Sequence, residues 1–319
     1  MRITDSILAA NLITSLNKSK ESINSLQNQI ATNSKINKPS DSPSGISRVL
    51  RLDDQIANID TFKSNIDNSL AFAQTSIDSM QAIQNEIEKL NVMFTDINNP
   101  TNQSSFNTYG DKIDLAIKSL VDLANAEYDG KYVFGGTDFS KKPFDFSSTT
   151  VVNPATGQNT TTVMQNVNTQ GVQNVRISTN IIQKINTTGQ EVFGTLPNAG
   201  NTPPDSPNLS STDIFNTLIR VRDNLKSGQK PADADVQIVK KFGENLLVKT
   251  TSAGEIQNRL DSTSDMLDNQ KLELQNLLSK EKDTDVAKAV IDLQNQQYFL
   301  EMSYKMASMT LPKSLLDYL

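Results

Sequence analysis

The chain has 319 residues, a net charge of −6 and 36% hydrophobic residues, and it contains no cysteine, histidine or tryptophan. Disulfides, thiolate chemistry and histidine-dependent catalytic triads are therefore excluded, and zinc and haem lose their usual ligands, so we expect no metal and no cofactor. The 30 basic residues are scattered rather than gathered on one face, which argues against nucleic acid as a partner.

The amino-terminal sequence does not resemble a secretory signal peptide, because no basic start is followed by an apolar run. No stretch is apolar for the length needed to cross a membrane. We therefore expect no membrane insertion. The protein is predicted to be either cytoplasmic or exported by a route that cleaves no signal.

Residues 1–32 carry the seven-residue apolar repeat of a helix that packs against other helices. Its two columns consist of Ala9, Leu16, Ile23 and Ile30, and of Leu12, Ser19 and Leu26. The polar residues between them are mostly Asn, Ser and Gln, so this helix would be marginal alone in water. The Pro-, Asn- and Ser-rich segment 33–45 is expected to end it.

A second, much longer helix is predicted from Pro43 to Ile97, because no proline or glycine interrupts the chain between Ile46 and Pro100. Such a helix would span roughly 80 Å. One apolar column repeats every seven residues, and it consists of Leu52, Ile59, Ile66, Ala73, Met80, Ile87 and Phe94. Because a narrow column on so long a helix needs cover from other helices, the pattern indicates an elongated bundle or coiled coil.

Residues 105–129 show a stripe typical of a helix antiparallel to the long one, and Asp129-Gly130 predicts a tight turn. Short β-like runs separated by turn residues follow, which predicts a small β-rich domain over 131–196. The predicted strands are 132–134, 144–146, 150–152, 160–164 and 172–177. The proline-rich run 196–210 is predicted to be a linker.

Helical pattern returns at 211–212 and first ends at Ser227-Gly228. Another helix begins at Lys230-Pro231, and the pattern allows it to continue past Gly254 into a second long apolar seam. A cap at 283–285 predicts a last helix, which Pro312 ends. Its apolar columns are Val286, Leu293, Leu300 and Ala307, and Val290, Gln297, Tyr304 and Leu311. The tail 314–319 is more apolar than an exposed end should be, which favours an assembly contact over a frayed terminus.

This order of elements predicts a mainly α fold with an inserted β domain, an elongated multi-helix bundle or coiled coil built from both chain ends. We expect a terminal helical core domain (1–42 and 284–319), a helical rod domain (43–130 and 211–283) and an inserted β-rich domain with its linker (131–210). The simplest closure pairs the two terminal helices with each other and the long helix with the seam at 255–280.

Five segments of the chain carry motifs that stand in a recognisable order. They are Asn-Lys-Pro-Ser-Asp-Ser-Pro-Ser-Gly at 37–45 with Ser-Arg-Val-Leu-Arg-Leu at 47–52, Lys-Tyr-Val-Phe-Gly-Gly-Thr at 131–137 with Pro-Phe at 143–144, Gly-Gln-Glu-Val-Phe-Gly at 189–194, Asp-Ile-Phe at 213–215 running on to Ser-Gly at 227–228, and Ser-Leu-Leu-Asp-Tyr-Leu at 314–319. Together they resemble flagellin-like axial proteins of the bacterial flagellum, and among these the hook–filament junction proteins. The resemblance covers nearly the full length.

The chain departs from this family in two places. At the first breaker the family often has a glycine before a basic residue, where Asn33-Ser34-Lys35 stands here; asparagine tolerates the left-handed backbone of such a turn. Filament flagellins usually carry an arginine-rich stretch on the long helix, which residues 80–90 lack. The second departure favours the junction proteins over the filament flagellins.

The resemblance implies a structural adaptor, not an enzyme, that joins the hook to the flagellin filament by coiled-coil packing of its terminal helices. The implied partners are the first hook-associated protein, flagellin, further copies of this chain in a ring, and a cytoplasmic export chaperone. It also implies uncleaved export through the flagellar type III apparatus to an extracellular place at the hook–filament junction. The alternative is a flagellin or minor flagellin that forms the filament itself.

On this interpretation the terminal helices form the subunit interface, because helices that order only on assembly offset that cost by burying apolar area. The candidate interface residues are Ile3, Ile7, Leu8, Leu12, Leu16, Ile23, Leu26, Val290, Leu293, Leu300, Tyr304, Leu311, Leu315, Leu316 and Leu319. The residues alone leave open that these are ordinary bundle helices already packed in the monomer.

An enzyme would need a catalytic constellation, and the carboxylate pairs Asp53-Asp54 and Asp283/Asp285 are the candidates for acid–base work or a bound cation. A solvated helix face and a helix cap explain these pairs better than catalysis does. Because we find no nucleophile elbow, phosphate loop or dinucleotide fingerprint, we expect no catalytic, metal or cofactor-binding residue.

Overall fold

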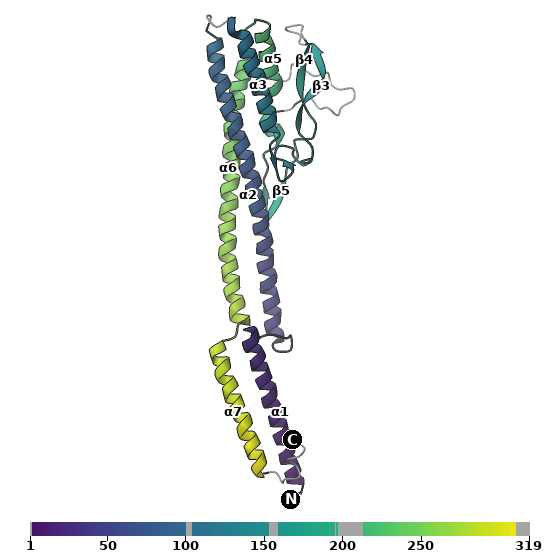
Figure 1. Ribbon diagram of the computed structural model, residues 1–319, viewed down its shortest axis with the longest axis vertical. Coiled ribbons are helices and arrows are strands. Elements are labelled where there is room, and N and C mark those ends of the chain that lie inside the picture. Colours follow the sequence, from purple (N-terminus) through teal and green to yellow (C-terminus); the bar gives the residue numbers. More distant parts are fainter. Residues whose placement is uncertain (1, 100–103, 153–158, 195, 197–212, 311–319) are drawn as a thin grey trace. The chain divides into compact units, whose positions relative to one another are not determined.

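The computed structural model describes residues 2–99, 104–152, 159–194, 196 and 213–310. The chain divides into two units, one made of residues 1–59 and 268–319 and the other of residues 60–267. The predicted fold class is confirmed, since helices from both chain ends dominate and a small β-rich region is inserted between them (Figure 1). Across the described residues we find no helix with the length and hydrophobicity of a membrane span.

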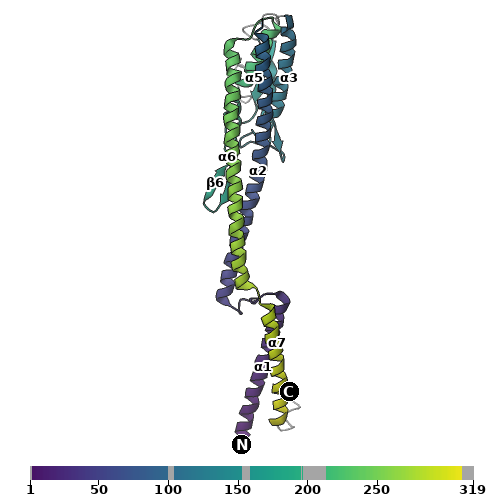
Figure 2. The ribbon, with the colours of Figure 1, turned by 90° about the vertical axis from the view of Figure 1, so that its left-hand side faces the viewer.

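Two long helices take part in both units, α2 (Pro43–Ile97) with 55 residues and α6 (Asp233–Lys282) with 50. Within residues 60–267 they lie side by side (Figures 1 and 2), and Gln257 Nε2 donates to Gln74 Oε1 at 3.0 Å. α6 runs unbroken through Gly243 and Gly254. The two helices approach closely at Gly243. A Cβ atom added to this glycine would lie only 3.1 Å from Ile87 Cγ2.

The seven-residue apolar column of α2 is the buried face of this helix, as predicted. Leu52 is half-buried. The other members are at most 7% exposed, and they are Ile59, Ile66, Ala73, Met80, Ile87 and Phe94. The sequence period therefore identifies the packed face of α2 correctly.

The core of the 60–267 unit extends from α2 and α6 into α3 (Phe106–Ala124) and α5 (Ile214–Lys226), which pack against each other. Ser79 Oγ on α2 donates to the carbonyl of Leu123 on α3 at 2.7 Å. Phenylalanine rings then connect the helices to the β-rich region. The ring of Phe193, at the end of the short helix α4 (Gly189–Phe193), lies 5.0 Å from Phe144 and 5.3 Å from Phe215, measured between centroids. Helices and strands of this unit thus share one core.

The described strands form three antiparallel pairs, β1 (Glu127–Tyr128) with β2 (Lys131–Tyr132), β3 (Phe144–Val152) with β4 (Asn159–Gln165), and β5 (Asn174–Ser178) with β6 (Ile181–Lys184). The predicted runs 144–146 and 150–152 are one strand with a bulge between them, and run 160–164 lies within β4. Run 172–177 becomes strand only at Asn174. Run 132–134 is wrong after Tyr132, where β2 ends; Val133 and Phe134 lie in the turn that follows and are fully buried. The sequence does not predict β6 or α4.

α3 ends at Ala124, before the predicted residue 129, because the side chain of Asn125 hydrogen-bonds to the backbone of a strand. Its side-chain amide donates to the carbonyl of Phe144 at 2.9 Å, and its side-chain oxygen accepts from the N–H of Phe144 at 3.0 Å. Asn125 therefore binds the start of β3 as a neighbouring strand would. The next residues form the β1–β2 hairpin, whose predicted turn is confirmed by φ values of 49° at Asp129 and 71° at Gly130.

The shared core predicts unequal effects of two leucine substitutions on the same helix. Leu120 is 1% exposed and Leu115 is 66% exposed, both on α3. Leu120→Ala should lower the free energy of unfolding by about 2–5 kcal/mol, because it leaves a cavity. The control Leu115→Ala should change it by no more than about 0.5 kcal/mol. Urea unfolding measures both, and similar losses would contradict the burial described for α3.

Glu191 predicts a pH dependence of stability. Its carboxylate accepts from the N–H of Thr188 at 3.0 Å and from Lys184 Nζ at 2.9 Å. Burial alone would raise the pKa of Glu191, but the hydrogen bonds from Lys184 and Thr188 outweigh it and lower this pKa from its usual 4.5. A carboxyl with a lowered folded-state pKa adds stability above pH 4.5, and that stability is lost as the pH falls from 4.5 through the folded-state pKa.

We therefore expect Glu191→Gln to flatten the loss of stability below pH 4.5. Urea unfolding at a series of pH values measures the slope. Glu255→Gln, which changes an exposed glutamate of α6, serves as the control and should keep the wild-type slope. An unchanged slope in Glu191→Gln would show that this carboxylate is not stabilised in the folded state.

Candidate assembly surface

The unit of residues 1–59 and 268–319 is built around a joint between α1 (Arg2–Thr32) and α7 (Val286–Thr310). α1 is followed by Asn33 with a φ of 51°, so asparagine makes the left-handed turn that a glycine would otherwise make. Ser34 pairs with Asp283 in an antiparallel bridge. The N–H of Lys35 donates to the carbonyl of Lys282 at 2.8 Å, and the N–H of Thr284 donates to that of Asn33 at 3.2 Å. Main-chain hydrogen bonds thus hold the end of α1 beside the start of α7.

Two surface carboxylates, the exposed Asp41 and the partly buried Glu281, support the segment around this joint. Asp41 accepts from the N–H groups of Lys38 and Asn37, both at 2.9 Å, and these hydrogen bonds lower the pKa of Asp41. Glu281 accepts from Arg48 at 3.1 Å, which lowers the pKa of Glu281. Because both groups face water, they contribute little stability, and the main-chain pairing remains the principal connection.

α1 and α7 pack against each other, but the seam between them is thin (Figures 1 and 2). Of their described side chains, the buried ones are Leu16, Ala289 and Ala307, at 3%, 5% and 3% exposure. Polar groups also enter the contact: Ser19 Oγ donates to Gln296 Oε1 at 3.2 Å, and Lys20 Nζ lies 5.9 Å from the centre of the Tyr304 ring. Two alanines supply little apolar area, so this seam buries much less than the core of the other unit.

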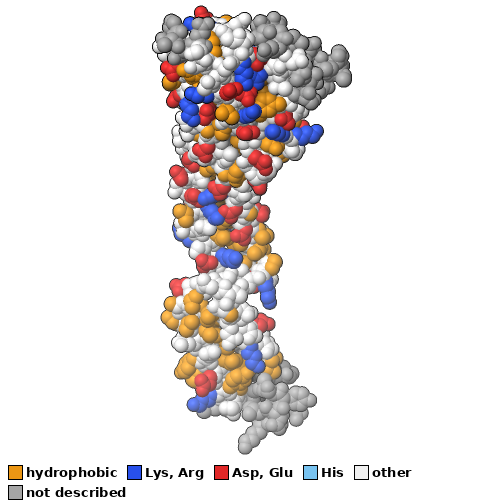
Figure 3. Space-filling view, turned by 45° about the horizontal axis from the view of Figure 1, so that its top comes forward, with side chains coloured by type: hydrophobic (Ala, Val, Ile, Leu, Met, Phe, Trp, Pro, Cys, Tyr) orange, Lys and Arg blue, Asp and Glu red, His pale blue; other side chains and the backbone are white. Residues whose placement is uncertain are grey.

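The remaining faces of α7 carry large apolar side chains in contact with solvent. Their exposed fractions run from 36% to 62%, and they are Val286, Val290, Ile291, Tyr298, Phe299, Met302, Tyr304 and Met306. α1 adds Ile7 at 56% and Ile13 at 43%. Figure 3 shows hydrophobic side chains gathered over the part of the surface that α1 and α7 form. A helix that is apolar on several sides is typical of one enclosed by neighbours.

The two units differ sharply in how well their apolar residues are covered. In the 60–267 unit one continuous core runs from Phe72 to Ala253. Burying a large apolar side chain fully is worth about 1.5–3 kcal/mol, so covering a side chain such as Phe299 would yield on the order of 1–2 kcal/mol. Several such side chains on one helix make a surface on which a partner helix would be stabilised.

The predicted interface residues fall into three groups. The α1–α7 seam contains Leu12, Leu16, Ile23, Leu26, Leu293 and Leu300, which are buried or half-buried. Ile7, Val290 and Tyr304 are exposed. The side chains of Ile3, Leu8, Leu311, Leu315, Leu316 and Leu319 lie outside the described part of the structure. The structure therefore brings the first group together within the chain and leaves the side chains of the second group exposed, with the Tyr304 ring beside Lys20.

Sequence reasoning missed the most exposed apolar residues of α7, namely Ile291, Tyr298, Phe299 and Met306. Ile291 and Tyr298 are seven residues apart, as are Phe299 and Met306, so both pairs are helical columns beside the predicted ones. Counting apolar residues on every face of this helix, rather than along two columns, would have found them.

The acidic pairs considered for catalysis do not form a constellation. Asp285 accepts from the N–H of Lys288 at 3.1 Å and so caps α7, and Asp283 accepts from Ser279 Oγ at 2.5 Å. Asp53 and Asp54 are exposed on α2. Among the described residues no group of three or more His, Cys, Asp or Glu could hold a metal ion.

Comparisons with known proteins now bear on this geometry. The sequence matches the bacterial flagellin N-terminal helical region over residues 3–138 and the bacterial flagellin C-terminal helical region over residues 236–319. Together these two regions span more than half of the chain, and they include α1 and α7. The comparison with curated proteins finds no match.

Solved structures with a similar fold come from several bacteria. A candidate flagellar hook-associated protein from Vibrio parahaemolyticus is 16% identical with a TM-score of 0.59, and the match covers 76% of this chain and 100% of that one. FlgL from Bacillus cereus is 18% identical with a TM-score of 0.52, covering 72% of this chain and 99% of that one. Hook-associated protein 3 from Legionella pneumophila is 14% identical with a TM-score of 0.57, covering 73% and 98%. At these identities the likeness is one of fold.

Proposed function

The chain belongs to the bacterial flagellin family, and from that premise we propose that it is a structural adaptor joining the hook of the flagellum to the flagellin filament. Its partners would be the first hook-associated protein on one side, flagellin on the other and further copies of itself in a ring. It would reach this extracellular place uncleaved, through the flagellar type III apparatus, after a cytoplasmic chaperone releases its carboxy-terminal helix. Its role would be mechanical, not enzymatic.

The observation that carries this proposal is the apolar surface of α7. Large side chains remain exposed there while the joint beside them is fixed by main-chain hydrogen bonds. Neighbouring subunits that lay their own terminal helices on this surface would bury it, and the gain would offset the cost of ordering both helices. If each subunit contacts the next with a different face, the contact does not close and builds a helical tube.

We assign the interface to the terminal helices as a whole. The side chains of α1 and α7 that face away from their common seam would make the first contacts, with Ile291, Phe299 and Met306 added to the predicted set. The seam residues, such as Leu16 and Leu300, would hold the two helices together inside one subunit. The terminal, rod and inserted β-rich domains divided at residues 42, 130, 210 and 283 would be the inner, middle and outer parts of the assembled adaptor.

A filament-forming flagellin is the second candidate function, because both matched regions are those of flagellin itself. The run 80–90 on α2 lacks the arginine-rich stretch that filament flagellins usually carry. The solved structures of similar fold are named as hook-associated proteins or FlgL. Both observations support the adaptor over the filament.

A deletion strain distinguishes these two roles. Cells without the chain should assemble hooks but bear no filaments, and flagellin subunits should accumulate in the medium, because nothing would seat them on the hook. Electron microscopy and immunoblotting of the medium measure the two effects. A strain that keeps filaments of normal length on its hooks would overturn the adaptor.

Complementing that strain tests the α7 surface. Ile291 is 58% exposed on α7 and Ile182 is 61% exposed on β6, so they form a matched pair. Ile291→Ser should restore fewer filaments than wild type, at unchanged thermal stability of the monomer, because it removes apolar contact from the interface. Ile182→Ser should restore filaments fully. Equal restoration by both variants would show that this face of α7 is not an interface.

A further inference from the structure

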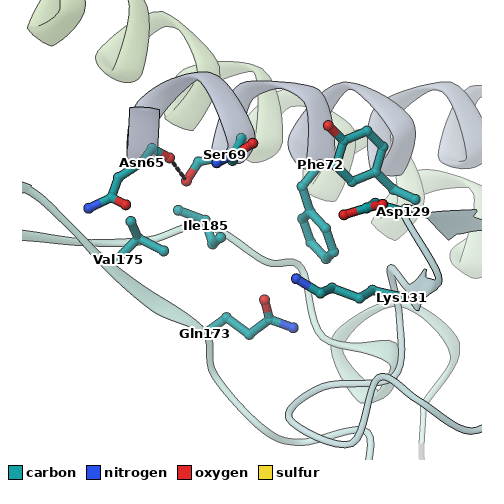
Figure 4. Close-up of a pocket in the computed structure, with 10 residues that line it drawn as sticks. Asn65, Ser69, Phe72, Asp129, Lys131, Gln173, Val175 and Ile185 are labelled. Atoms are coloured by element: carbon teal, nitrogen blue, oxygen red, sulfur yellow. Dashed lines mark hydrogen bonds between the residues drawn. The ribbon is translucent and has the colours of Figure 1, made fainter. Parts of the chain in front are cut away.

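A cavity of about 270 Å³ opens in the 60–267 unit between α2, the β1–β2 hairpin and the β5–β6 pair (Figure 4). Its floor is apolar and buried, since Phe72 is 4% and Ile185 is 8% exposed. Polar groups stand around its rim, from Asn68 on α2, Asp129 and Lys131 on the hairpin, and Gln173 before β5. The cavity is smaller than the ~300–1,000 Å³ of sites for drug-sized ligands, so it suits a ligand of about one ring.

The walls of this cavity are held in place without a ligand. Asn65 Nδ2 donates to the carbonyl of Arg176 at 3.0 Å, which ties α2 to β5. Gln173 Nε2 donates to the carbonyl of Gly136 at 2.7 Å, and its N–H donates to Asn186 Oδ1 at 2.8 Å. The left-handed turn at Asp129 and Gly130 puts Asp129 at the hairpin tip and Lys131 directly after it, opposite Tyr128. A preformed site loses little free energy to ordering when it binds.

The rim offers donors and acceptors that the chain does not use itself. Among the described residues the exposed side chains of Asn68 and Asp129 make no hydrogen bond or ion pair, and the ammonium of Lys131 lies 5.4 Å from the centre of the Phe139 ring. Asp129 and Lys131 carry opposite charges, so the cavity favours neither an anion nor a cation. Figure 4 shows their charged ends, together with the amide of Gln173, around the ring of Phe72.

We propose that this cavity binds a neutral sugar ring, a pyranose, as a free monosaccharide or as the terminal residue of a glycan. The C–H face of such a ring would lie on Phe72 and Ile185 and lose contact with water. The hydroxyl groups at its edge both donate and accept, so they would pair with Asp129, Asn68 and Lys131 together. A free amino acid would engage the two charged groups but leave the side-chain amide of Asn68 without a partner, which is why the sugar is favoured.

Saturation-transfer difference NMR on the full-length protein tests this proposal. The probes are glucose, galactose and N-acetylglucosamine, their methyl glycosides, and serine as the amino acid. We expect saturation on ring C–H protons of at least one sugar and none on serine. A methyl glycoside that binds as well as its free sugar identifies the end of a glycan as the source, and one that does not bind identifies the free monosaccharide.

Substitutions locate the binding. Asp129→Asn keeps the turn, because asparagine accepts the left-handed backbone, and Asn68→Ala removes one amide. Each should weaken the sugar about tenfold, the loss expected for one hydrogen-bonding group. The controls Asp122→Asn and Asn107→Ala change exposed residues of α3 outside the cavity and should bind as wild type. Far-UV circular dichroism confirms that the variants fold.

Three results would overturn the proposal: no saturation of any sugar, sugar binding that the two cavity variants leave unchanged, or saturation of serine equal to that of the sugars. The cavity contains no residue of α1 or α7. A negative result for sugar binding therefore says nothing against the adaptor role. A negative result for the adaptor role likewise says nothing against sugar binding.

Discussion

This structure depends on one requirement: the apolar faces of its long helices must be packed against other side chains. In the 60–267 unit the seven-residue column of α2 finds cover from α6, α3 and the phenylalanine cluster around Phe193, and its central members are almost fully buried. In the other unit α1 and α7 cover each other along one thin seam, and the outer faces of α7 remain in water. One chain thus combines a unit whose apolar helix faces are covered with a pair of helices whose outer apolar faces are exposed.

The two units also differ in the kind of partner that their exposed surfaces suit. An exposed run of Ile, Tyr, Phe and Met on a helix has no directional chemistry, so it suits another helix, whose register is set by the seven-residue spacing. The small cavity beside the β1–β2 hairpin has a fixed rim of donors and acceptors, so it suits a small polar ligand. Hydrogen bonds from Asn65 to Arg176 and from Gln173 to Gly136 hold the walls of that cavity within the 60–267 unit.

The sequence predicted what depends on local pattern. The seven-residue columns identified the buried face of α2, proline and capping residues located its ends, and Asp129-Gly130 specified the hairpin turn. Where long-range contacts decide, the predictions failed. Asn125 ends α3 because its amide binds the backbone of Phe144, a pairing between residues that nothing in the local sequence relates. Val133 and Phe134 are residue types that favour strands, but they lie in a turn and are buried in the core. β6 has only four residues, too few to show the two-residue alternation of a strand.

In the candidate surface, the buried side chains of α1 and α7 are Leu16 and Ala307, which belong to the predicted columns, and Ala289, which does not. The columns did not show how much of α7 stays uncovered. That depends on the alanines at 289 and 307, which let the helices approach while burying little area. The expectation that the chain holds no cofactor rested on its composition and on the lack of cofactor-binding motifs. The cavity near Phe72 was invisible to sequence reasoning, because its lining comes from α2, a hairpin and a later strand pair that only the fold assembles.

Hydrogen exchange of the backbone amides in the isolated full-length protein tests most directly whether the terminal helices await cover from neighbouring subunits. The protection of an amide reports the free energy of the opening that exposes it. We expect the amides of α1 and α7 to exchange orders of magnitude faster than those of α3 and of residues 60–97 in α2, because so little apolar area holds the terminal pair. Equal protection in both units would show that α1 and α7 are already fully packed in the monomer, and would contradict folding on assembly.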